Sequence, residues 1–162
     1  MAAGGFGFGG ASSSSSKIDE STPWVAAGEG NIELLQEAME KLNLPINAAD
    51  SNGFTFVHAA ASYNQIETLR WILSKDGVDV NASDTDGDTP LHHCDKSEAA
   101  KILVEEGSAD FQITNNDGKT ALEVKLDELE ECNEDENDSD DEDDLTSLKL
   151  LVKYLQILKG IP

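Results

Sequence analysis

Apolar residues recur with helical spacing in short segments that polar turns separate. Between Ile66 and Leu73, positions 66, 69, 72 and 73 are apolar and lie on one face of a helix. A shorter segment of small residues, 57–61, precedes this helix. Near the C-terminus, apolar residues again share one helical face: Leu148, Leu151, Val152, Leu155 and Leu158. The pattern predicts an all-α chain in which a short helix is followed by a longer amphipathic one.

The polar turns between these helices repeat one phrase three times. Residues 50–55 read DSNGFT, residues 84–89 read DTDGDT, and residues 116–120 read NDGKT. The glycines of the three phrases lie 34 and 31 residues apart. Each glycine supplies a positive φ at the tip of a short hairpin turn, and the threonine that follows stands where a helix must begin and be capped. The chain is therefore predicted to be a repeat protein whose units open with a turn.

The segment Asp84–His92, DTDGDTPLH, resembles the signature of ankyrin repeats, and the period of the repeat agrees with that family. The resemblance covers residues 21–126 and 145–160, and small acidic fungal-type ankyrin proteins look most similar. It implies an α-helical solenoid of about four helix-pair repeats. The first unit lacks a preceding turn, as a capping repeat would. The third unit departs from the family because it is three residues short between His92 and Glu98.

Composition divides the chain into four segments. Residues 1–19 are rich in Gly, Ala and Ser and are predicted to be a disordered arm, since they cannot bury enough apolar area to offset the entropy of ordering. Residues 20–126 hold repeats one to three and the first helix of repeat four. Thirteen of the eighteen residues in 127–144 are acidic and none is basic, which predicts a disordered acidic insertion. Residues 145–162 are predicted to form a C-terminal capping helix.

The charge of the chain restricts its partners. Its 162 residues include 33 acidic and 11 basic ones, a formal net charge of −22, which repels nucleic acid and anionic lipid and attracts basic surfaces. Two cysteines, Cys94 and Cys132, build no disulfide framework, so we expect a cytoplasmic or nuclear location. No secretory leader or apolar span is recognised. We expect a monomer that binds neither nucleic acid nor membrane.

Residues with metal-ligand or catalytic chemistry have structural explanations. The ankyrin resemblance implies that His58 and His92 bond to neighbouring turns. Adjacent residues of the segment His92–Asp95 point to different faces of a short helix, so no metal site is predicted there. The acids of 84–95 imitate a calcium loop, but Thr89 stands where that loop requires glycine. With no phosphate loop and no nucleophile elbow, we predict neither enzymatic activity nor a cofactor.

Cys94 aligns with a small core alanine of the family, which favours a buried thiol. The resemblance also implies that partners contact the tips of the turns and the first helices. Carried over residue by residue, it selects Ser51, Asn52, Phe54, Ser62, Tyr63, Thr85, Asp86, Asp88, Asn116, Asp117 and Lys119. Phe54 and Tyr63 are the strongest candidates, because an exposed aromatic residue beside acids is typical of a binding hot spot. The alternative that Phe54 packs on a neighbouring turn stays open.

Two functions fit these observations. The first is a protein-binding adaptor. The second is a chaperone or escort of a strongly basic protein, such as a ribosomal protein or a histone, for which the acidic insertion replaces nucleic acid. Without residues 127–144 the net charge would still be −9, so the repeats are acidic too, although acidic loops also serve solubility alone. Ser139 is followed by a run of acids that begins Asp140, Asp141, Glu142 and Asp143, and it is a candidate for phosphorylation, which adds about −1.5 to −2 charges.

Overall fold

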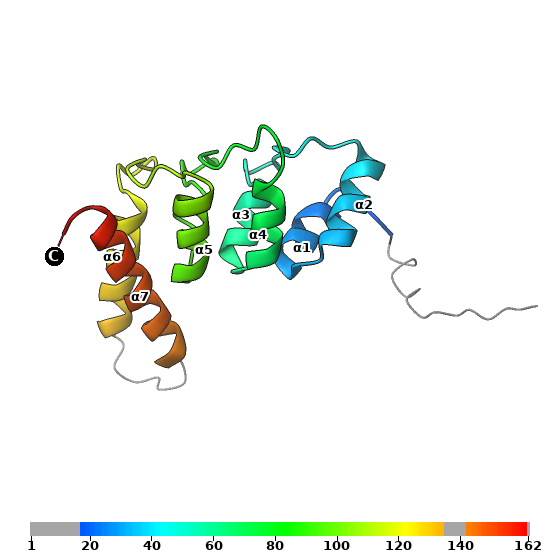
Figure 1. The fold of residues 1–162 in the computed structure, drawn as a ribbon. Coiled ribbons are helices and arrows are strands. Elements are labelled where there is room, and N and C mark those ends of the chain that lie inside the picture. The colour runs from blue at the N-terminus through cyan, green and yellow to red at the C-terminus, as the bar shows by residue number, and fades with distance from the viewer. Residues whose placement is uncertain (1–16, 135–141, 162) are drawn as a thin grey trace, which may run out of the picture.

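The computed structural model describes residues 17–134 and 142–161, and its helices stand side by side in one row (Figure 1). This confirms the predicted all-α repeat fold. A single hydrophobic core runs along the row from repeat one to the C-terminal helix. The helices are α1 (Thr22–Glu29), α2 (Ile32–Leu42), α3 (Phe56–Ser62), α4 (Ile66–Leu73), α5 (Ser97–Lys101), the π-helix η2 (Ile102–Glu106), α6 (Ala121–Glu134) and α7 (Glu142–Leu158).

Three turns, which we call fingers, project from one edge of the row: residues 50–55, 84–89 and 115–120 (Figure 1). In each finger the N–H of the first residue donates to the carbonyl of the fifth at 2.9 to 3.0 Å. A side-chain oxygen of this first residue accepts from the N–H groups of the third and fifth residues at 2.8 to 3.1 Å. The glycines have φ between 75° and 80°, so the predicted positive φ is confirmed.

The fingers are joined to one another by their backbones. The N–H of Thr85 donates to the carbonyl of Asn52 at 2.8 Å, and the N–H of Asn116 donates to the carbonyl of Asp86 at 2.9 Å. A Cβ atom on Gly87 would lie 2.7 Å from the backbone nitrogen of Asn116. The second finger therefore has to carry glycine for two reasons, its positive φ and the close approach of the third finger.

We expect Gly87→Ala to lower the free energy of unfolding by more than about 2 kcal/mol, and Gly118→Ala by only about 1 kcal/mol. Both glycines have a positive φ, but a Cβ on Gly118 meets nothing within 4 Å. Gly118→Ala thus measures backbone strain alone, and the difference measures the contact between fingers. Urea unfolding followed by circular dichroism gives both values. Equal losses would contradict the close packing of the fingers.

Repeat three differs from the helix pair predicted for it. Residues 90–93 form a single turn, held by the N–H of His92 to the carbonyl of Thr89 at 2.9 Å, where other repeats have a first helix. Its second helix starts as α5 and continues as η2. The missing three residues explain the difference, because the chain is too short to complete a helix before it must turn back. The first-helix face is therefore interrupted at repeat three.

The acidic insertion is shorter than predicted. Helix α6 extends through Glu134, so residues 127–134, predicted as part of a disordered insertion, are helical, and α7 begins three residues before the predicted boundary. Leu122, Leu126 and Leu129 lie at i, i+4 and i+7 and pack in or against the core, which holds the acidic turns in a helix. Residues 135–141, with Ser139, lie outside the described residues, as does all of the predicted arm 1–19 except 17–19.

Helix α7 packs on α6 and α5 and closes the row (Figure 1). Leu151, Val152 and Leu155 are buried, in agreement with the predicted apolar face. After α7, the N–H of Gly160 donates to the carbonyl of Ile157 at 3.0 Å, and the N–H of Ile161 to that of Gln156 at 2.9 Å. These are the two bonds of a glycine-terminated helix end. None of the described helices is long and apolar enough to cross a membrane.

Candidate functional site

Buried imidazoles tie the second and third fingers to the repeat before each of them. His58 Nδ1 accepts a bond from the backbone N–H that opens its own helix at 3.1 Å, which leaves Nε2 as the donor. Nε2 donates to the carbonyl of Asp88 in the second finger at 3.1 Å. His92 makes the same pair of bonds one repeat further on, with its Nε2 donating to the carbonyl of Lys119 at 3.0 Å. The structural role expected for both histidines is confirmed.

Trp24 takes this role in repeat one, which sequence analysis missed. Its indole Nε1 donates to the carbonyl of Phe54 in the first finger. This bond and that of His58 each span 30 residues, whereas the bond of His92 spans 27, because repeat three is three residues short. The shared spacing of 30 residues was the signal in the sequence that could have revealed the role of Trp24. In repeat four, Glu123 stands at the position that His58 and His92 have in the earlier repeats. Its carboxylate accepts from the N–H and hydroxyl of Thr120 at 2.7 and 2.8 Å.

A cluster of rings lies between the first and second fingers. The ring centroids of Phe54 lie 5.0 Å from His58 and 5.2 Å from His93. His93 Nε2 also bonds to Asp84 Oδ2 at 2.8 Å. Phe54 is therefore half-buried within the finger row rather than exposed, which agrees with the alternative that it packs on its neighbours. Its packing partner His93 comes from the next repeat, which is why the sequence left the alternatives open.

The other selected residues lie along the fingers and at the end of α3. Tyr63 is 69 % exposed and covers Gly28 of α1, where a Cβ would lie 2.9 Å from its ring. Asp88 is half-buried and accepts from Asn115 Nδ2 at 2.8 Å, so its carboxylate joins two fingers. Ser62 is half-buried as well. The exposed members are Ser51, Asn52, Tyr63, Thr85, Asp86, Asn116, Asp117 and Lys119.

Comparison with known proteins identifies this arrangement. Residues 57–94 match a family model of ankyrin repeats in many copies, and residues 86–116 match one of the single ankyrin repeat. The chain contains ankyrin repeats. It is 42 % identical over 101 residues to the ankyrin repeat-containing protein P1E11.10 of Schizosaccharomyces pombe. That match covers 62 % of this chain and 48 % of the relative, so the chain spans about half the length of the curated protein it matches.

Ankyrin repeats make this chain a protein-interaction module, because repeat stacks present extended surfaces to other proteins. Ankyrin-repeat proteins are typically non-enzymatic. Cys94 is buried within the ankyrin core, and burial raises the pKa of its thiol to about 12. Its Sγ donates to the carbonyl of Pro90 at 3.4 Å. The thiol thus has the environment of a small core residue rather than that of a nucleophile.

Three possible metal ligands, His58, Asp84 and His93, meet beside the second finger, and their ligand atoms lie within 4.8 Å of one another. His58 does not fit a metal ion. Its Nε2 carries the proton that it donates to Asp88, and the proton cannot move to Nδ1, where the N–H of Thr55 already points. Only Asp84 and His93 remain, which is too few for a zinc site. His92, considered from the sequence, faces the third finger instead.

The buried His58 predicts a pH dependence of stability. Burial lowers its pKa below the ordinary 6.5, against the opposing effect of its bond to the Asp88 carbonyl. As the pH falls below 6.5, the unfolded chain therefore takes up this proton before the folded chain does, so the free energy of unfolding falls. Urea unfolding at several pH values between 7.5 and 5 measures the slope. It should be smaller in His58→Gln, and an unchanged slope would contradict this assignment.

At still lower pH, the stability of the fold depends on a different residue, Asp84. Burial alone would raise the pKa of Asp84, but its bonds from His93 and from the N–H groups of Asp88 and Asp86 outweigh that effect and lower it. The stability that Asp84 contributes is therefore present above its ordinary pKa of 3.8 and is lost at lower pH. This window lies below that of His58, so the two contributions separate along one pH titration.

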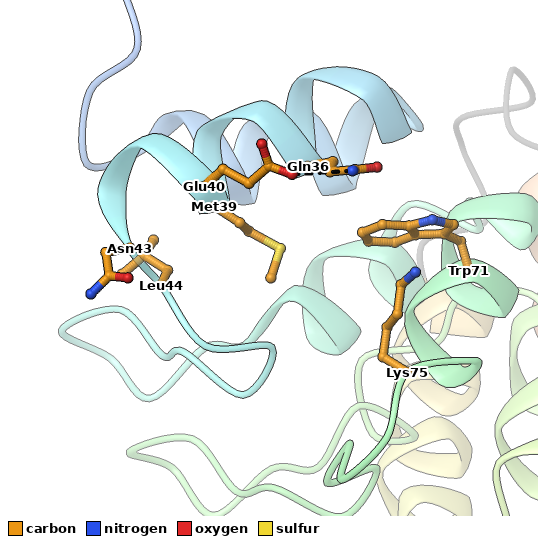
Figure 2. A pocket seen from close by; sticks show the side chains of 7 residues that line it. All are labelled: Gln36, Met39, Glu40, Asn43, Leu44, Trp71 and Lys75. Atoms are coloured by element: carbon orange, nitrogen blue, oxygen red, sulfur yellow. Dashed lines mark hydrogen bonds between the residues drawn. The ribbon is translucent and has the colours of Figure 1, made fainter.

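A shallow pocket of about 310 Å³ lies between α2 and α4 of the ankyrin stack (Figure 2). The Lys75 ammonium lies 4.2 Å from the ring centroid of Trp71, and Gln36 donates to Glu40 at 3.2 Å. The side chains of Gln36, Glu40 and Lys75 in the pocket are thus paired with one another or with a ring, and none of the residues selected from the sequence lines it. We regard it as a groove between two repeats. Its lining is Gln36, Met39, Glu40, Asn43, Leu44, Trp71 and Lys75.

Proposed function

We propose that this chain is a non-catalytic adaptor that binds a protein partner through its fingers and the exposed end of α3. The observation that carries the proposal is the bonded row of fingers, in which backbone hydrogen bonds and buried rings fix each exposed tip relative to the next. A preorganised surface loses little conformational entropy on binding. Tyr63, largely exposed at the end of α3, is the strongest candidate for an anchor.

The charges of this surface support a basic partner. Among the residues selected for binding, Lys119 alone is basic, and its ammonium pairs with Asp127 of α6. That pair cancels the one positive charge, while Asp86 and Asp117 are exposed on the fingers and Glu130 and Glu131 on α6. We therefore propose, as the second candidate, that the partner is a strongly basic protein such as a ribosomal protein or a histone, escorted by the monomer in the cytoplasm or nucleus.

The test compares capture of defined basic proteins by the intact chain and by charge variants. A histone and a purified basic ribosomal protein are offered to the immobilised chain across a salt series, with an acidic protein as the negative control. We expect Glu130→Gln with Glu131→Gln to slow association roughly threefold at low salt and to flatten its salt dependence. The matched control, Glu29→Gln with Glu33→Gln, removes two exposed acids from repeat one and should leave association unchanged.

If a basic protein associates with both double variants at the same rate, the proposed role of the charges on α6 is wrong. If neither basic protein binds while another protein is captured through Tyr63, the adaptor proposal stands and the escort proposal is wrong.

Truncating Tyr63 tests the anchor. We expect Tyr63→Ala to weaken binding by about 1 to 2 kcal/mol, seen as roughly 5- to 30-fold faster dissociation with little change in association. Val25→Ala is the control, because Val25 is also exposed but was not selected for binding. Phe54→Ala should instead lower stability, since its ring packs on His58 and His93. Surface-based kinetics give both rates, and an unchanged dissociation rate for Tyr63→Ala would remove it from the site.

A further inference from the structure

Helix α7 exposes apolar side chains that its packing in the stack does not use. Leu150, Ile157 and Ile161 are 54, 63 and 43 % exposed. Leu150, Tyr154 and Ile157 follow the spacing i, i+4 and i+7, and the hydrogen bonds after Gly160 fold Ile161 back over the last turn. We call Leu150, Tyr154, Ile157 and Ile161 the outer stripe. Most of the large apolar side chains exposed in the described residues belong to it.

The three exposed residues of the outer stripe, Leu150, Ile157 and Ile161, are distinct from the face that holds α7 in the stack. Leu151, Val152 and Leu155 are buried against the neighbouring helices. At 100° per residue, the stripe lies more than about 100° around the helix from the centre of that buried face. Isolated apolar residues on a surface need no explanation, but a line of them along one helix has the spacing with which helices dock. Tyr154 is half-buried and its hydroxyl donates to Glu105 Oε1 at 3.1 Å, whereas Leu150, Ile157 and Ile161 are exposed and form a docking face beside it.

The part of α7 that carries the stripe is basic, although α7 begins with three acids and Glu105 of η2 accepts the bond from Tyr154. Residues 145–162 contain three lysines and no acid, in a chain of net charge −22. Lys149 and Lys153 are exposed, and each directly precedes a residue of the stripe. On the neighbouring helix, the Lys101 ammonium lies 5.6 Å from the centroid of the Tyr154 ring. Three ammonium groups thus border the stripe against one carboxylate, that of Glu105, and they favour an occupant with negative charge along its apolar face.

We propose that the outer stripe docks an amphipathic helix of a partner protein, with an apolar face flanked by acidic residues. Two copies of α7 paired about a twofold axis would share the same basic border, which disfavours self-association through it. The chain's net charge disfavours an anionic lipid surface. The stripe lies on α7, whereas the fingers project from the edge of the row (Figure 1). The chain would then hold a basic partner at the fingers and an acidic helix at α7.

The experiment uses the full chain and two labelled helical peptides with one leucine face, flanked by glutamates in one and by lysines in the other. We expect the glutamate peptide to bind at least about tenfold more tightly than the lysine peptide at low salt. Leu150→Gln with Ile157→Gln should weaken its binding at least about tenfold. Both side chains are already largely exposed, so the urea midpoint should not change. Val25→Gln, at the other end of the stack, is the matched control and should bind normally.

Charge is tested by Lys149→Gln with Lys153→Gln, which should bring the affinities of the two peptides together. Lys96→Gln, an exposed lysine outside α7, should not. Equal affinity of the intact chain for the two peptides, or binding unaffected by the stripe variant, would overturn the proposal. Sedimentation and flotation with phosphatidylserine vesicles are run in parallel. A dimer or a vesicle complex that the stripe variant abolishes would replace the acidic helix with a second copy or a lipid surface.

Discussion

Replacing His92 with alanine is expected to lower the free energy of unfolding by about 3 kcal/mol. The imidazole is 4 % exposed and is bonded at both nitrogens, to the N–H and hydroxyl of Thr89 and to the carbonyl of Lys119. Alanine would leave the buried N–H of Thr89 without a partner, open a cavity, and release the third finger from repeat three. The loss therefore combines an unsatisfied donor with missing packing, and urea unfolding measures it.

Two variants separate the parts of this effect. Glu123 has the same place in repeat four, but its hydrogen bonds lie within its own turn, and its ion pair with Lys159 at 3.8 Å is exposed. Glu123→Ala should therefore cost about 1 kcal/mol, as the loss of a cap does. Trp24→Phe keeps a ring in repeat one and removes only the N–H that bonds to Phe54, which should also cost about 1 kcal/mol. If His92→Ala costs no more than these, the bonds between repeats contribute little to stability.

The fingers were predictable because their physics is local. A glycine with positive φ, an aspartate or asparagine side chain that bonds its own turn, and a threonine at a helix start depend on residues within one phrase. The buried face of α7 was predictable for the same reason, since helical spacing places Leu151 and Leu155 together. These features identified the family before any contact between repeats was known.

The features that sequence analysis missed depend on contacts between repeats. Trp24 substitutes for a histidine only because its N–H reaches a carbonyl 30 residues away. Phe54 is half-buried because His93 arrives from the next repeat to pack on it. In α6, the density of acids predicted a loop, but Leu126 and Leu129 pack against the core and keep the acidic turns helical. Tertiary packing thus outweighed local charge repulsion.

The residues of the candidate binding site also fall into those predictable from local sequence and those that depend on contacts between repeats. Tyr63 and the tips of the fingers are exposed as the family pattern predicted. Asp88 and Phe54 have the same kind of sequence position, yet their side chains contact the next repeat. A position in the repeat therefore predicts which side of the solenoid a residue lies on, whereas its neighbours in the next repeat decide whether it is available to a partner.

The role of Lys125, like those of Trp24 and Phe54, is revealed only by its packing. It stands at the place that Ala60 has in repeat two and Cys94 in repeat three, both of them buried. Its side chain is only 3 % exposed, and its ammonium bonds to Asp95 of repeat three at 3.3 Å and to Glu128 at 3.0 Å. A charged group thus replaces a small apolar one between repeats three and four. Both carboxylates are considerably exposed, whereas the ammonium is not.

This asymmetry predicts unequal effects when the charges are removed. Lys125→Met should change the free energy of unfolding by less than about 1 kcal/mol, because methionine fills much of the space of the lysine stem and the exposed carboxylates of Asp95 and Glu128 regain water. Asp95→Asn with Glu128→Gln should instead cost about 2 to 3 kcal/mol, since the ammonium would stay buried without a counter-charge. Urea unfolding at neutral pH compares them. A larger loss for Lys125→Met would show that the ion pair itself stabilises this interface, because the buried ammonium would then gain more from its carboxylates than it loses in hydration.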